Sequence, residues 1–219
     1  MNKYKLLIII CFFLVTISMP KVTAVVKNLN LLGKTIVLDA GHGGKDEGAS
    51  SGQIKESKLN LILVKKLEKE LISRGATVYL TREDDNDLST TTINRKRSDL
   101  YRRAEYINKI SPDIYISLHL NSSPSPSWRG LQIFYTNNNK ENKEIALSLT
   151  NYLKEKLSNT REAKKDSTYY MYKHIKSPGV LIEAGFISNP SDNYLLRDEK
   201  YQNKLITLIA DSIENYYQK

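Results

Sequence analysis

The chain alternates short runs rich in β-branched residues with longer stretches whose leucines and isoleucines recur at helical spacing. Strand patterns occupy residues 35–39, 76–81, 114–118, 131–135 and 180–182. Helical patterns occupy residues 59–73, a segment around Leu100, Ala104 and Ile107 that must end before Pro112, residues 141–157, and a C-terminal stretch with Leu205, Leu208 and Ile209. Strands that alternate with helices usually pair in parallel and are covered by those helices. The sequence therefore predicts a three-layer α/β/α sandwich with a largely parallel central sheet.

The start of the chain has the composition of an export signal. Residues 6–17 are almost wholly apolar, they follow Lys3 and Lys5, and small residues precede a cleavage point near Ala24. The apolar run is about 12 residues long, short of the roughly 20 that cross a bilayer. Lys21 could weaken processing and leave an anchor, and a buried N-terminal helix is the remaining alternative. We expect an export signal or anchor at residues 1–24, a short tether at 25–34, and one domain at 35–219 that is exported across the membrane.

Composition limits the chemistry that the domain can use. Cys11 is the single cysteine, which excludes an intramolecular disulfide, a thiolate zinc cluster and an iron–sulfur site. Any metal must therefore be held by carboxylates and by the three histidines. The formal charge is +9, and it falls to +6 (30 basic minus 24 acidic residues) when the lysines of the export segment are removed. This charge is too small to indicate a nucleic-acid partner without a concentrated basic patch, whereas other polyanions remain candidate partners.

Two histidines and a glutamate follow predicted strands at equivalent points: His42 after the first strand, His119 after the third and Glu183 after the last. Because the carboxyl ends of parallel strands share the edge at which ligands bind, we expect these side chains to converge. Glu56, between a glycine-rich loop and the first helix, can reach the same edge. Two imidazoles and one carboxylate with an open fourth position are typical of catalytic zinc, and a further carboxylate completes a hydrolytic arrangement.

Each of these residues also has a structural explanation. His42 and His119 could be hydrogen-bonded residues without a ligand role. Glu183 follows an apolar strand, where an unpaired carboxylate is costly, so a salt bridge or a metal site must explain it. Glu56 could be a helix N-terminal carboxylate that the helix dipole favours. The loop at residues 41–45 matches neither G-x-x-x-x-G-K-[ST] nor G-x-G-x-x-G, the two common sequence patterns of phosphate-binding loops. This argues against a bound nucleotide.

Several polar segments are expected at the surface. Residues 84–94 and 159–177 are candidate loops, and His174 lies among lysines in the second of them. A basic cluster is interpreted as a solvated helix face, with contact to an anionic wall polymer as the alternative. Its members are Arg95, Lys96, Arg97, Arg102 and Arg103.

Four blocks occur in order along the chain: IVLDAGHGG at 36–44, YLTR at 79–82, ISLHLN at 116–121 and LIEAGFISN at 181–189. Together they resemble the zinc-dependent N-acetylmuramoyl-L-alanine amidases over roughly residues 35–217. The resemblance implies that Zn²⁺ is the cofactor, that His42, Glu56 and His119 are its ligands, and that Glu183 is the catalytic glutamate. Ala40 departs from the proline that often follows the aspartate of the first block, without touching the chemistry.

Residues 95–108, 126–130 and 176–180 resemble the sporulation and germination branch of that family. The reaction so implied is hydrolysis of the amide between the lactyl group of N-acetylmuramic acid and the L-alanine of the stem peptide. In spore cortex this reaction is a step toward muramic δ-lactam, which implies a location in the space around the developing spore. The alternatives are a zinc peptidase that acts within the stem peptide and a non-catalytic wall-binding protein.

The expected partners are peptidoglycan strands with their stem peptides. Residues 131–182 leave little length for the extra helix that covers the zinc in some relatives, so we expect an open groove. Without a wall-binding module, affinity and timing would depend on an activating protein partner. Residues 169–172 (YYMY) are a candidate contact, and the alternative is that they pack beside the last strand. No nucleic acid is expected, and membrane contact is expected only through an uncleaved N-terminal segment.

Overall fold

The computed structural model describes residues 29–218, so the predicted export signal and the first part of the tether lie outside the described residues. The strands are β1 (Thr35–Ala40), β2 (Ser50–Ser51), β3 (Ile54–Lys55), β4 (Thr77–Leu80), β5 (Ile114–Asn121), β6 (Gln132–Tyr135), β7 (Lys164–Lys165) and β8 (Gly179–Phe186). The helices are α2 (Glu56–Ser73), α3 (Arg95–Ile110), α4 (Asn142–Lys156), α5 (Pro190–Arg197), α6 (Glu199–Tyr217) and the one-turn η1 (Met171–His174). None of the helices in this part of the chain is long and apolar enough to cross a bilayer.

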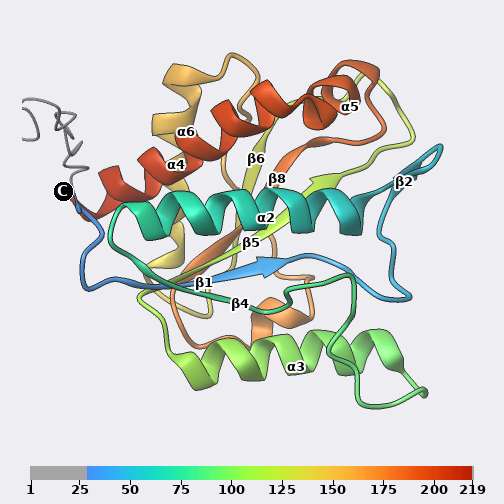
Figure 1. Cartoon of the computed structure of the whole chain (residues 1–219), viewed down its shortest axis with the longest axis horizontal. Coiled ribbons are helices and arrows are strands. Elements are labelled where there is room, and N and C mark those ends of the chain that lie inside the picture. The colour runs from blue at the N-terminus through green and yellow to red at the C-terminus, as the bar shows by residue number, and fades with distance from the viewer. Residues whose placement is uncertain (1–28, 219) are drawn as a thin grey trace, which may run out of the picture.

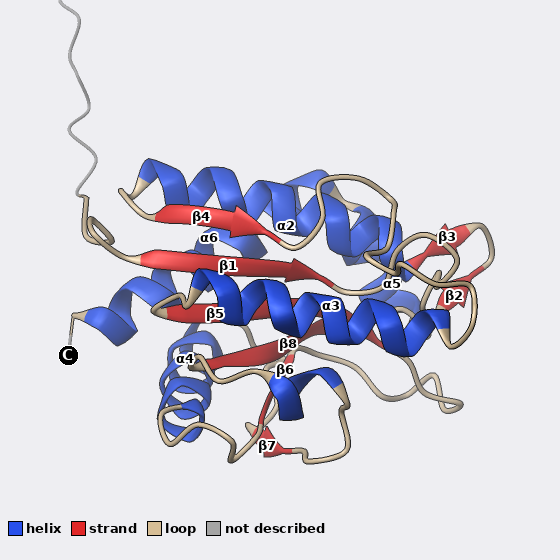
Figure 2. Cartoon of the chain, turned by 90° about the horizontal axis from the view of Figure 1, so that it is seen from below, coloured by secondary structure: helices blue, strands red, loops and turns tan. Residues whose placement is uncertain are grey.

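Six strands form the central sheet in the order β4-β1-β5-β8-β6-β7 (Figure 2). The strands β4, β1, β5 and β8 are parallel, whereas β6 is antiparallel to β8 and β7 is parallel to β6. A parallel connection needs a crossover of about a dozen residues or more. The segment between β5 and β6 is shorter than this, so β6 runs antiparallel to the central strands. The predicted three-layer, largely parallel architecture is confirmed.

The two faces of the sheet are covered unequally (Figure 1). Helices α2, α4 and α6 cover one face and enclose the larger core, to which β5 contributes Ile114, Ile116 and Leu118. On the other face, α3 and η1 enclose a smaller core around Tyr115 and Leu181. This smaller cover leaves a groove of about 280 Å³ over the carboxyl ends of the central strands.

Some predicted boundaries are wrong in an informative way. Strands β5 and β8 continue through His119 and Glu183, which the sequence places just beyond the strands, because these two residues pair with each other in the ladder. The C-terminal helical region is divided into α5 and α6. Residues 84–94 form an exposed loop as predicted, but residues 159–177 contain β7 and η1 and bury Ile175.

Candidate active site

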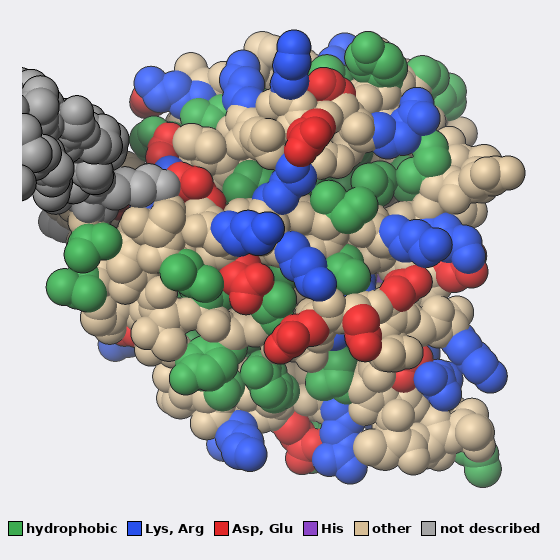
Figure 3. All heavy atoms as spheres, in the orientation of Figure 1, with side chains coloured by type: hydrophobic (Ala, Val, Ile, Leu, Met, Phe, Trp, Pro, Cys, Tyr) green, Lys and Arg blue, Asp and Glu red, His purple; other side chains and the backbone are tan. Residues whose placement is uncertain are grey.

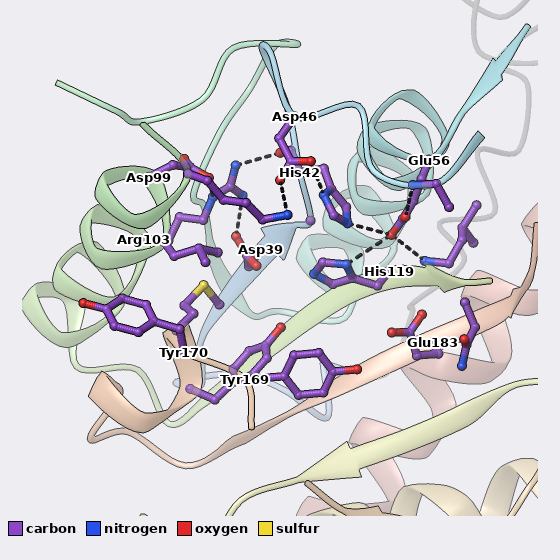
Figure 4. Close-up of a pocket in the computed structure, with 18 of the residues that line it drawn as sticks. Asp39, His42, Asp46, Glu56, Asp99, Arg103, His119, Tyr169, Tyr170 and Glu183 are labelled. Atoms are coloured by element: carbon purple, nitrogen blue, oxygen red, sulfur yellow. Dashed lines mark hydrogen bonds and ion pairs between the residues drawn. The ribbon is translucent and has the colours of Figure 1, made fainter. Parts of the chain in front are cut away.

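The structure brings the four predicted site residues together in the groove (Figure 4). His42 lies in the loop after β1, Glu56 is the first residue of α2, and His119 and Glu183 face each other on β5 and β8. One possible ligand atom from each of His42, Glu56 and His119 lies within 4.8 Å of the other two. Their convergence is therefore observed, whereas their roles as ligands or catalyst remain predictions.

The carboxylate of Glu56 lies between the two imidazoles. Its Oε1 is 3.1 Å from His42 Nε2 and 3.1 Å from His119 Nδ1. The same oxygen accepts a hydrogen bond from the backbone N–H of Leu120, and Oε2 accepts one from the backbone N–H of Ala49. Burial by itself would raise the pKa of Glu56, but the hydrogen bonds and charges of His119 and His42 hold it well below its usual range.

His42 is held in an unusual conformation. Its φ of 61° is in the left-handed region, which non-glycine residues rarely adopt. Its Nε2 faces Glu56, and its Nδ1 lies 3.1 Å from Asp46 Oδ1. Burial by itself would lower the pKa of His42, but the contacts with Asp46 and Glu56 outweigh this effect and raise the pKa to about 9.

Two buried arginines hold the loop that carries His42. Arg103 donates hydrogen bonds to the backbone carbonyls of Ala40 and His42, and Arg82 donates to those of Ala40 and Gly41. Every carbonyl oxygen from Ala40 to His42 therefore accepts a hydrogen bond from a guanidinium. This arrangement fixes the path of the loop and hence the direction of the His42 ring.

The position of Arg103 corrects the prediction that this residue belongs to a solvated helix face. Its side chain is only 1% exposed, and it forms ion pairs of 2.8 Å with Asp39 and 2.9 Å with Asp99. Burial by itself would raise the pKa of Asp39, but Arg103 and the hydroxyls of Ser117 and Thr81 lower it to about 2. The two carboxylates stabilise a charge that burial alone would disfavour.

Gly41 allows the loop to pass directly beside His119. A Cβ atom at Gly41 would lie 2.2 Å from Cε1 of the His119 ring, a distance that real contacts do not reach. The backbone carbonyl of Gly41 also accepts a hydrogen bond from the Asn60 side chain, which reaches Glu56 Oε1 as well. A side chain at Gly41 would therefore displace the His119 ring.

Glu183 differs from Glu56 in having no partner for one of its oxygens. Its side chain is buried, and among the described residues no hydrogen bond reaches Oε2 and no cation forms an ion pair with the carboxylate. Burial raises the pKa of Glu183 to about 7, with the charges of His119 and His42 opposing the shift and that of Glu56 adding to it. The salt bridge that would have explained Glu183 structurally is thus not found among these residues.

Aromatic residues line the groove opposite the histidines, and they correct a second prediction. Met171 and Tyr172, offered as partner contacts, are buried. Tyr172 stacks on Tyr115 of β5 with ring centroids 6.2 Å apart, and its hydroxyl donates to Ser117 Oγ. The alternative that this segment packs beside the last strand is therefore correct for these two residues, which share a buried cluster with Leu181 of β8, while Tyr169 and Tyr170 remain half-buried at the groove.

His174 and the members of the basic cluster other than Arg103 lie largely at the solvated surface. His174 is exposed, as predicted. Within the basic cluster, Arg95 pairs with Asp87, Lys96 with Asp46 and Arg102 with Glu105. On the face drawn in Figure 3, lysine and arginine side chains are interspersed with acidic ones. That face presents no continuous basic patch of the kind that nucleic-acid binding requires.

Sequence reasoning missed two residues that shape the site, Asp39 and Arg82. Asp39 and Arg82 lie inside two of the blocks that carried the resemblance, so their presence was visible although their contacts were not. A buried aspartate at a strand end requires a cation, and this requirement could have directed attention to the arginines. Tyr169 was singled out only as part of a partner contact, and its place in the groove could not be predicted because it depends on how the η1 segment folds onto the sheet.

Comparison with known proteins agrees with the geometry. The sequence profile of the N-acetylmuramoyl-L-alanine amidase family matches residues 36–215, which include nearly the whole described domain. The chain belongs to this family. The amidase is 40% identical over 195 residues to the germination-specific N-acetylmuramoyl-L-alanine amidase of Bacillus subtilis, covering 87% of this chain and 82% of that protein.

Two further relatives extend the comparison. A probable cell wall amidase of Staphylococcus aureus, LytH, is 33% identical over 190 residues, which are 85% of this amidase but only 60% of LytH. The structure of the CwlD amidase from Clostridioides difficile, determined in complex with the GerS lipoprotein, superposes with a TM-score of 0.79 at 36% identity. That match covers 84% of this chain and 98% of the CwlD chain. These similarities support the predicted enzyme class and a location at the cell wall.

Proposed function

We propose that this amidase is a zinc enzyme that cleaves the amide between N-acetylmuramic acid and L-alanine in the peptidoglycan of spore cortex. The observation that carries the proposal is the meeting of His42, Glu56 and His119, whose possible ligand atoms lie within 4.8 Å of one another. Two imidazole nitrogens and one carboxylate oxygen suit Zn²⁺, and three protein ligands leave a position open, as catalytic zinc requires. The residues present therefore fit the ion that the family resemblance implies.

His42, Glu56 and His119 would hold the ion, and Asp46 would orient His42 through its Nδ1. When bound, the ion supplies Lewis-acid polarisation of the scissile carbonyl and lowers the pKa of a nearby water. Arg103 and Arg82 keep the His42 loop in place through the carbonyls of residues 40–42. A ligand loop held by such contacts needs little rearrangement during the reaction.

Glu183 is the proposed proton carrier. Its carboxylate lines the groove next to the ligand cluster and its Oε2 has no hydrogen-bond partner among the described residues, so the group can accept a proton from the attacking water and deliver it to the departing L-alanine nitrogen. Burial raises the pKa of this carboxyl to about 7, which suits a group that both takes and gives a proton near neutral pH. The absence of a salt bridge to any described residue leaves the carboxylate available for this exchange.

The test separates metal binding from proton transfer. Chelation should abolish activity and zinc should restore it. His119→Ala should lose both the metal and activity, whereas Glu183→Gln should keep the metal and lose about 10²- to 10⁴-fold in rate. Full turnover in a preparation shown by elemental analysis to be metal-free would refute the zinc proposal, and near-normal turnover by Glu183→Gln would refute the role of that residue.

The proposed substrate is spore cortex, as a step toward muramic δ-lactam. This proposal draws support from the germination-specific amidase of Bacillus subtilis, which is similar over most of its length. Deleting the gene in its host should remove δ-lactam from cortex muropeptides and leave the vegetative wall intact. A normal δ-lactam content would indicate an amidase of general wall turnover instead.

A protein partner is the last element of the proposal. The similar CwlD amidase was determined in complex with a lipoprotein, which supports the expectation that this enzyme is also assisted. The partner would promote metal or substrate binding at the cell-wall side of the membrane. If the purified enzyme, supplied only with zinc, reaches full metal occupancy and full specific activity, no partner is needed.

A further inference from the structure

Beyond β8, outside the residues that line the groove, the guanidinium of Arg161 lies close to two aromatic rings. The guanidinium carbon of Arg161 lies 4.4 Å from the ring centroid of Trp128 and 5.7 Å from that of Phe186. Its Nε donates a 3.1 Å hydrogen bond to Gln132 Oε1. These contacts place the side chain at the edge of the sheet and fix the plane of its guanidinium.

The loop that presents Trp128 is anchored at several points. The backbone N–H of Gly130 donates to Asp192 Oδ2, and the side chain of Asn189 donates to the carbonyl of Pro126. A Cβ atom at Gly130 would lie 1.8 Å from the carbonyl oxygen of Asn159, so glycine is required for the loop to approach the Arg161 segment. Trp128 is nevertheless 48% exposed. A fixed and half-exposed indole is suited to contact a ligand.

Arg161 has no acidic partner in the part of the chain that the structure describes. Among residues 29–218, no carboxylate forms an ion pair with it, and its two terminal nitrogens donate no hydrogen bond. Neighbouring cations are neutralised, since Arg129 lies 3.7 Å from Asp192 and Lys154 pairs with Glu162. An arginine that stacks on aromatic rings and has both terminal nitrogens free of hydrogen bonds has the geometry for bidentate binding of a carboxylate.

The register of the sheet places this arginine beside the reaction centre. Gln132, which binds Arg161, is directly opposite Glu183, and Glu183 is directly opposite His119. Residues opposite each other share a face of the sheet, and neighbouring strands are about 4.8 Å apart. The Arg161 guanidinium is therefore roughly 10 Å from the carboxylate of Glu183, a span of about two to three extended residues.

We propose that Arg161 and Trp128 form a subsite that binds a carboxylate of the stem peptide, on the peptide side of the scissile amide. The proposal rests on the proposed function, in which the substrate is a glycan strand with a peptide attached. The N-acetylated sugars of such a strand are neutral, whereas the stem peptide carries carboxylates. An unpaired guanidinium two to three residues from the cleavage point therefore selects the peptide rather than the glycan.

Arg97, which lies on the ring of Tyr170, provides a matched control. Its guanidinium carbon lies 4.9 Å from the ring centroid of Tyr170, so it is also an arginine on an aromatic ring without an acidic partner in the described chain. Unlike Arg161, Arg97 is exposed and stacks on one ring only. It also forms no hydrogen bond with Gln132, the residue that lies opposite Glu183 in the sheet. Arg97→Gln therefore removes the same charge as Arg161→Gln but leaves the proposed subsite intact.

The experiment compares two soluble N-acetylmuramoyl peptides, one with a free carboxylate on the residue after L-alanine and one with that carboxylate converted to its amide. For the zinc-loaded enzyme, kcat/KM should be about 10- to 100-fold higher for the free carboxylate, the range expected of a charge-assisted hydrogen bond. Arg161→Gln should bring the ratio near one by lowering kcat/KM for the substrate with the free carboxylate. Arg97→Gln should keep the wild-type ratio, and Trp128→Ala should give an intermediate value.

Other results would overturn the proposal. It fails if wild-type enzyme does not distinguish the two substrates, or if Arg161→Gln retains the wild-type ratio. If Arg161→Gln keeps the wild-type ratio but its activity is no longer stimulated by a protein partner, Arg161 belongs to a protein interface instead. If wild-type enzyme hydrolyses neither substrate, the proposed function itself fails. A melting curve that matches that of the wild type verifies that Arg161→Gln is folded, and Arg161→Lys, which keeps the charge but not the planar fork, should retain part of the ratio.

Discussion

Replacing Arg103 by methionine should destabilise the domain by about 3–5 kcal/mol, because it leaves a buried carboxylate without its counterion. The side chains of Arg103 and Asp39 are each only 1% exposed, and the ion pair between them measures 2.8 Å. The substitution also removes the donor to the carbonyl of His42. In a domain of this size each kcal/mol lowers the melting temperature by about 2–4 °C, so the expected shift is about 6–20 °C.

The reasoning is tested by a double variant in urea unfolding of the metal-free protein. Adding Asp39→Asn to Arg103→Met should restore about 1–2 kcal/mol, because the amide carries no charge that needs a counterion. Arg102→Met is the matched control: this neighbouring arginine is half exposed and pairs with Glu105 at the surface, so its loss should cost less than about 0.5 kcal/mol. The argument would be refuted if Arg103→Met cost no more than Arg102→Met, or if Asp39→Asn destabilised the Arg103→Met protein further.

Three other outcomes are expected. Because the pKa of Asp39 is lowered from 3.8 to about 2, its contribution of about 2 kcal/mol should be complete above pH 4 and be lost as the pH falls toward 2; acid titration of wild type and Asp39→Asn should show this difference. Gly41→Ala should weaken zinc binding by about 10- to 100-fold in chelator competition, because its Cβ would displace the His119 ring; unchanged affinity would show that the ring can move without cost. Tyr172→Phe, which removes only the hydroxyl that donates to Ser117, should destabilise the protein by about 1 kcal/mol in thermal melts, and no effect would mean that water replaces this contact.

The sheet and the meeting of the four site residues could be predicted because both follow from periodicity and from the shared edge of parallel strands. The positions of His119 and Glu183 within their strands could not. A polar residue after an apolar run has the same sequence pattern whether the strand ends there or continues. What decides is the ladder between β5 and β8, in which the two residues are paired.

The burial of Arg103 and Tyr172 could not be predicted from the sequence for a different reason. Helix α3 contains many charged residues, so its periodicity alone does not distinguish Arg103, which points inward, from Arg102, which points outward. The distinction depends on Asp39, which lies far away in the sequence and needs a cation. In the same way, Tyr172 is buried because Tyr115 and Ser117 of β5 provide a surface and a hydrogen-bond acceptor, and neither is visible from the local sequence.

The most direct measurement is mass spectrometry of purified peptidoglycan digested by the zinc-loaded enzyme, with Glu183→Gln as the parallel control. The account predicts free stem peptides that begin at L-alanine, together with intact glycan chains whose muramic acid ends in a lactyl carboxyl group. The Glu183→Gln protein should release these products about 10²- to 10⁴-fold more slowly. Products cut within the stem peptide, or equal release by the two proteins, would contradict the account.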